Sequence, residues 1–182
     1  MRPQLLSIAV VLSLSIPAAA SAQPRMPHKD ANAVGGEVGV FIPRADGWST
    51  GPELDGFVEH YLTARDSLRV GVGWQNPKLE SNSDDRMRQI RLGAEIVHNW
   101  EGGAVHPFVG AGLGAFFLQE RLNGTNIHPS TTQLGGTLLG GVEYFTSKTF
   151  AVKGEARYNI VSKSGGFDPS GLSLTIGVKS YF

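Results

Sequence analysis

The chain has 182 residues, which is room for one domain with its own core and little else. Its 16 basic and 16 acidic residues give no net charge, which argues against a nucleic-acid-binding protein with a basic face. There is no cysteine, so disulfides and thiolate metal sites are excluded. The 24 glycines are an excess over the usual ~7% and call for a structural explanation.

The chain begins with a segment typical of secreted bacterial proteins. Met1-Arg2 supplies a positive start, residues 5–16 form an apolar run, and Ala20-Ser21-Ala22 offers the small residues that signal peptidase needs. The run is shorter than the ~20 apolar residues of a membrane-spanning helix. We therefore expect residues 1–22 to be a cleaved signal peptide and residues 23–33 to be an N-terminal spacer.

From residue 34 onward, apolar residues recur at every second position, in short segments separated by turn residues. In the last segment Leu174, Ile176 and Val178 alternate with Thr175 and Lys179. Repeated segments of about ten residues with this period are typical of transmembrane barrel strands. In chain order, the expected strands are 34–42, 54–62, 68–75, 87–98, 107–118, 133–145, 150–158 and 171–182.

The connections between these segments alternate in length. The short ones are 63–66, 99–105 and 146–148, whereas the longer, polar ones are 43–52, 77–86, 119–131 and 161–170. Short periplasmic turns and longer extracellular loops alternate in this way in outer-membrane barrels. The sequence thus predicts an all-β protein whose residues 34–182 form a closed, eight-stranded, antiparallel, up-and-down transmembrane β-barrel in the bacterial outer membrane.

Charged residues fall on the face opposite the apolar one, which would line the lumen. An eight-stranded barrel is just wide enough for its own side chains to fill it, and charges buried there must pair. We expect a structural ion-pair network, room for the long arginines beside inward glycines, and no open pore. The expected members of the network are Glu37, Glu59, Arg69, Arg91, Glu95, Glu143, Lys153, Glu155, Arg157 and Lys179.

Three segments resemble a known family. Pro107-Phe108-Val109-Gly110-Ala111-Gly112-Leu113-Gly114, Gly140-Gly141-Val142-Glu143-Tyr144-Phe145 and Gly154-Glu155-Ala156-Arg157-Tyr158 are similar to the barrel domain of small surface proteins of the OmpA, OmpX and opacity-protein type. Phe182 resembles the C-terminal signal by which the barrel assembly machinery recognises its substrates. The resemblance implies outer-membrane lipids and lipopolysaccharide as surroundings, but this architecture serves many roles.

Function is therefore expected to be structural or to involve interactions at the cell surface. We predict no enzyme activity, no cofactor and no metal site. Two alternatives stay open: a lipid A-modifying outer-membrane enzyme, and a soluble lipocalin-like ligand-binding barrel, which would need an apolar interior. The His and Ser of His128-Pro129-Ser130 match the enzymes poorly, because the segment is a loop with an intervening proline. Asp84-Asp85 is interpreted as a solvated loop pair.

Overall fold

The computed structural model describes residues 27–81, 85–122, 125–126, 131–163 and 168–182. The expected signal peptide, the first four residues of the spacer (23–26) and the segment His128-Pro129-Ser130 lie outside these ranges. The described residues contain no helix long and apolar enough to cross a membrane.

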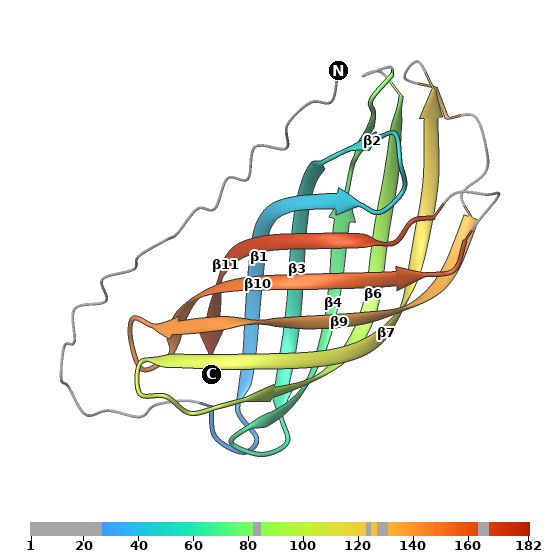
Figure 1. Ribbon diagram of the computed structural model, residues 1–182. Coiled ribbons are helices and arrows are strands. Elements are labelled where there is room, and N and C mark those ends of the chain that lie inside the picture. The colour runs from blue at the N-terminus through green and yellow to red at the C-terminus, as the bar shows by residue number, and fades with distance from the viewer. Residues whose placement is uncertain (1–26, 82–84, 123–124, 127–130, 164–167) are drawn as a thin grey trace.

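Eight long strands in the described chain form a single closed antiparallel barrel (Figure 1). They are β1 (Asn32–Pro43), β3 (Gly51–Tyr61), β4 (Asp66–Gln75), β6 (Arg86–Asn99), β7 (Val105–Leu122), β9 (Thr131–Phe145), β10 (Phe150–Val161) and β11 (Gly171–Tyr181). Each pairs with its neighbour in the chain, and β1 pairs with β11 from Ala33↔Tyr181 to Pro43↔Gly171, which closes the ring. The predicted fold class is confirmed.

The alternation that predicted the strands is the alternation of exposure in the structure. Val38 on β1 is 53% exposed and Ile176 on β11 is 68% exposed. Glu37, directly before Val38 and on the opposite phase, is 3% exposed. A strand points successive side chains to opposite faces, so one phase meets the surroundings and the other fills the lumen. The apolar phase lies outside throughout, the reverse of a soluble barrel.

Three further strands of two residues each extend the long-loop end: β2 (Trp48–Ser49), β5 (Lys78–Leu79) and β8 (Thr125–Asn126). These residues belong to the expected loops 43–52, 77–86 and 119–131. β2 pairs with β5, and β8 pairs with the end of β7. Pairs this short have no periodicity to detect, and they form because the neighbouring strands extend beyond the expected ends.

Outward aromatic side chains occur near both ends of the barrel. Tyr144 and Phe150 lie near the short turns, and Phe117 lies near the long loops, each 38–41% exposed. Trp74 is half-buried, also on the outward phase near the long loops. Aromatic residues at two levels are typical of barrels that meet two membrane–water interfaces.

Candidate functional site

All ten residues of the expected network lie in the lumen, each at most 5% exposed. The strands β1, β3, β4, β6, β9, β10 and β11 contribute them. β7 instead presents Gly110, Gly112 and Gly114 on its inward phase. Within the described residues, the lumen is thus the region with the highest concentration of ionisable side chains.

At the centre of the lumen, two arginines share one acid. Asp55 Oδ1 lies 2.5 Å from Arg91 Nη2 and 2.8 Å from Arg157 Nη1. Arg91 Nη1 also lies 2.8 Å from Glu95 Oε1, and Arg157 Nη2 lies 2.6 Å from Glu155 Oε1. The contacts to Asp55 and Glu95 are hydrogen bonds, and charge-assisted hydrogen bonds of this length are strong where burial removes competing water.

Next to this cluster, Arg69 and Lys153 bind further acids. Arg69 Nε lies 3.0 Å from Glu59 Oε2, and its Nη1 lies 2.8 Å from Glu155 Oε2. Lys153 Nζ lies 2.7 Å from the same Glu155 atom and donates to Glu37 as well.

Aromatic rings lie beside these cations. The Arg69 guanidinium and the Lys153 ammonium lie 4.5 and 4.6 Å from the Phe57 ring centroid. Lys153 is also 5.0 Å from the ring centroid of Phe108. These distances are within the range of cation–π attraction, which is stronger where water is excluded.

Towards the short turns, Lys179 is held by two acids and a tyrosine. Its Nζ lies 2.9 Å from both Glu59 Oε2 and Glu143 Oε1, and it donates to Tyr61 Oη at 2.7 Å. Tyr181 Oη donates to the other oxygen of Glu143 at 2.5 Å. Lys179 is the one cation within ion-pair distance of Glu143 in the described structure.

The expected set omitted two acids, both on β3. Asp55 is 8% exposed and bridges two arginines, and Glu53 is 1% exposed. With them the strands place seven acids in the lumen (Glu37, Glu53, Asp55, Glu59, Glu95, Glu143 and Glu155) against five bases (Arg69, Arg91, Lys153, Arg157 and Lys179). The alternation along β3 could have identified both acids in the sequence, because they flank the outward-facing Leu54 and therefore point inward.

Glu53 differs from the other six acids because no cation of the described chain is within ion-pair distance of it. Its Oε1 accepts from Gln75 Nε2 at 2.8 Å, and its Oε2 has no donor. A buried carboxylate without a cation is costly.

We expect Glu53→Gln to leave the free energy of unfolding within about 1 kcal/mol of wild type, or to raise it, because glutamine has the same shape and needs no cation in the lumen. Urea unfolding in lipid vesicles measures this. Glu59→Gln is the matched control and should be clearly destabilising, because it leaves Arg69 and Lys179 short of one partner. Equal losses in the two variants would contradict the assignment.

The inward glycines have a different role from the expected one. A Cβ at Gly35, Gly141, Gly135 or Gly171 would stand 2.2–2.8 Å from a Phe57, Phe108, Phe116 or Phe41 ring carbon respectively. Among the described glycines, Gly93 alone would bring a Cβ within 3.0 Å of an arginine, Arg91. The expectation that glycines chiefly accommodate arginines is therefore wrong: four of the described glycines make room for phenylalanine rings, and at others, such as Gly39 and Gly112, the nearest atom is a backbone carbonyl oxygen of the neighbouring strand.

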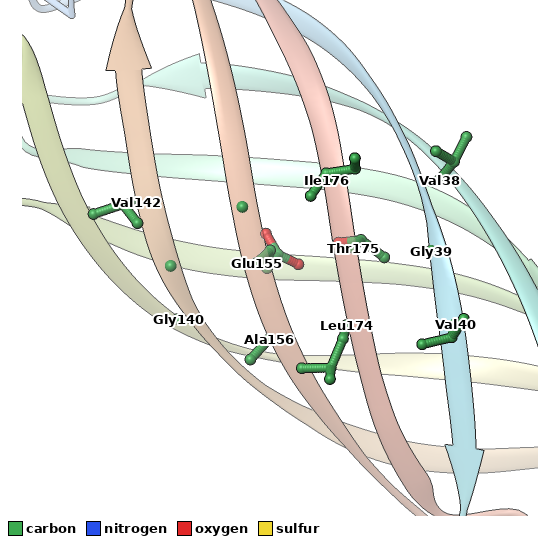
Figure 2. Close-up of a pocket in the computed structure, with 12 residues that line it drawn as sticks. Val38, Gly39, Val40, Gly140, Val142, Glu155, Ala156, Leu174, Thr175 and Ile176 are labelled. Carbon is green, nitrogen blue, oxygen red and sulfur yellow. The ribbon is translucent and has the colours of Figure 1, made fainter. Parts of the chain in front are cut away.

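A surface groove between β1, β9, β10 and β11 lies outside the barrel (Figure 2). Residues that line it include Val38, Val142, Leu174 and Ile176, together with Gly140 and Ala156 (Figure 2). Because these residues belong to the outward phase, the groove faces the lipid.

The described histidines are bound to neighbours that are not nucleophiles. His60 Nδ1 lies 2.9 Å from Asn32 Oδ1, and His98 Nδ1 lies 2.7 Å from Asp66 Oδ1. His106 is buried, with Nε2 3.0 Å from the Gly103 carbonyl oxygen, and His28 Nδ1 contacts the Lys29 carbonyl oxygen.

No group of three histidine or acidic side chains in the described ranges has the geometry to hold a metal ion. Of the pair Asp84-Asp85, only the second residue lies in those ranges. Asp85 is 7% exposed, so the interpretation of it as a solvated loop residue is wrong. Its carbonyl oxygen accepts from the Leu79 N–H and thus joins the β5 segment to the start of β6.

A closed barrel with an apolar outside, two levels of aromatic residues and a lumen lined by paired charges defines the class of small outer-membrane β-barrels. Residues 6–182 match the family model described as "Outer membrane protein beta-barrel domain". The chain belongs to this family and is a protein of the bacterial outer membrane. Comparison with curated proteins gives no match.

Solved structures show the same fold at low sequence identity. Neisserial surface protein A is 16% identical with a TM-score of 0.69, and the match covers 86% of this chain and 100% of that one. The N-terminal barrel domain of Pseudomonas aeruginosa OprF is 12% identical, with a TM-score of 0.63 and coverages of 86% and 100%. The attachment invasion locus protein Ail of Yersinia pestis is 12% identical, with a TM-score of 0.60 and coverages of 85% and 99%.

Proposed function

We propose that this barrel acts through its external surface, as a structural or surface-interaction protein, and does not conduct solutes. The observation that carries the proposal is the lumen, where five bases and seven acids from seven strands are nearly all paired and none is more than 8% exposed. Moving a solute through it would separate buried ion pairs, which costs several kcal/mol. The network has a structural role in this proposal.

The fold neighbours are consistent with a surface role. As their names state, one is a neisserial surface protein and another is an attachment invasion locus protein. In this chain the corresponding surface consists of the long loops and the ends of the strands that carry them.

We also propose that the protein is not an enzyme. No histidine of the described ranges has a serine or threonine hydroxyl as a hydrogen-bond partner, which a nucleophile–base pair requires. A soluble lipocalin-like barrel is excluded by the family and by the charged interior.

For assembly, Phe182 is the residue that we propose the barrel assembly machinery recognises. It is 72% exposed on the outward phase at the end of the closing strand, and its backbone exchanges two hydrogen bonds with Asn32. A terminal aromatic side chain that remains on the lipid-facing surface is available before and after closure of the barrel.

A conductance measurement tests the proposal. We expect the purified protein, reconstituted in planar bilayers, to give no stepwise current, because no water-filled path crosses the packed lumen. An open porin is the positive control, and a shift on boiling in SDS gels establishes that the reconstituted protein is folded. Reproducible single-channel steps from the folded protein would refute the closed lumen.

A further inference from the structure

Three basic residues form a cluster at the long-loop end of β5 and β6, which we call the β5–β6 basic cluster: Lys78, Arg86 and Arg88. In the strand register Lys78 is directly opposite Arg86. Arg88 is exposed, and Lys78 and Arg86 are half-buried. Like charges directly opposite one another in a sheet are destabilising, so this arrangement has a cost unless an anion lies between them.

The cluster has no acid to balance it within the described chain. Other exposed arginines lie near acids: Arg44 is 3.9 Å from Asp168, and Arg65 is 3.8 Å from Glu101. Among the described residues no acidic side chain lies within 4 Å of Lys78, Arg86 or Arg88. This includes the exposed Glu80, two residues beyond Lys78, whose carboxylate is not within 4 Å of any of the three basic side chains.

The depth of the cluster is fixed by the strand register. Ile90 of β6 is paired with Trp74 of β4 and with Phe117 of β7, which belong to the outward aromatic level near the long loops. Arg88 and Arg86 follow on the same face, two and four residues further out. At ~3.3 Å per residue they stand about 7 and 13 Å along the strand beyond the aromatic level. In an outer-membrane barrel this is the headgroup layer of the outer leaflet.

We propose that the β5–β6 basic cluster binds the phosphate groups of lipopolysaccharide. Guanidinium groups match phosphate oxygens with two parallel hydrogen bonds, and a doubly charged phosphate would relieve the Lys78–Arg86 repulsion. The outward phase of Arg86 and Arg88 favours a ligand in the membrane over one in free solution. This inference rests on the proposed function, because it takes the long loops to be extracellular.

Native mass spectrometry of the folded full-length protein with lipid A tests the proposal, with phosphate-free lipid A as the comparison. A basic residue near an anionic membrane surface contributes roughly a fivefold gain, so Arg86→Ser with Arg88→Ser should weaken lipid A binding by about twenty-five-fold. Wild type should lose a similar factor with phosphate-free lipid A. Arg65→Ser, an exposed arginine at the opposite end, is the matched control and should bind as wild type does.

Undiminished binding of lipid A by the double variant, or equal binding of phosphate-free lipid A by wild type, would overturn the proposal. Binding of the soluble polyanion sucrose octasulfate through the same arginines, without any preference for lipid A, would overturn the assignment to a membrane lipid. Failure of the closed-barrel proposal has a separate signature, because it would show as stepwise conductance and not as a change in lipid A binding.

Discussion

Lys179→Met is expected to lower the free energy of unfolding by about 3–5 kcal/mol, the usual loss when one partner of a buried ion pair is removed. Lys179 is completely buried and lies 2.9 Å from Glu143 and from Glu59. Methionine fills a similar volume, so the loss comes from charge. In the variant, Glu59 is still paired with Arg69. Glu143 has only the Tyr181 hydroxyl as a partner, so its buried charge is no longer balanced.

Reversible urea unfolding in lipid vesicles measures this loss. Adding Glu143→Gln to Lys179→Met should recover most of it, because the orphaned charge is then removed as well. Arg65→Met is the surface control: Arg65 and Glu101 are more than half exposed and 3.8 Å apart, so the change should cost less than about 1 kcal/mol. If Lys179→Met cost no more than the control, Glu143 would not be a buried anion that depends on Lys179.

Ile176→Arg is expected to cost about 2–4 kcal/mol in the same assay, the usual penalty for arginine on the lipid face near the midplane. Ile176 is 68% exposed on the outward phase, in the middle of β11 (Figure 2), and is paired with Val38 and Gly154. The guanidinium would have to stay in hydrocarbon or distort the bilayer to reach water.

The matched control is His60→Arg, because His60 is also exposed on the outward phase but lies near the end of β3 at an interface. There the same side chain should cost about 0–1 kcal/mol. The informative quantity is the difference between the losses in unfolding free energy at the two depths. Similar losses at both positions would mean that the apolar face does not meet a membrane of the expected thickness.

The strand positions and their inward and outward faces could be predicted from the sequence. Segments such as 171–182 carry a local period of two, and in a closed barrel a residue's environment depends mainly on its phase. The phase therefore placed Leu174 and Ile176 outside and Lys179 inside before any partner was known. The short turns and long loops likewise follow from the spacing of the segments.

The partners inside the lumen were decided by the tertiary structure. Arg69 and Glu155 are 86 residues apart, and Lys153 and Glu37 are 116 apart, so their contacts depend on how the strands tilt and stagger when the barrel closes. The bridging role of Asp55 and the lack of a cation at Glu53 arise from the same geometry. The strand register likewise placed Lys78 opposite Arg86.

By itself, the sequence determined an all-β membrane barrel with its apolar face outward, because alternation is a property of single strands. The tertiary structure decided which inward charges pair, which glycines admit a ring and where basic side chains are left unbalanced. These features depend on distances between strands far apart in the chain. Only closure of the barrel fixes those distances.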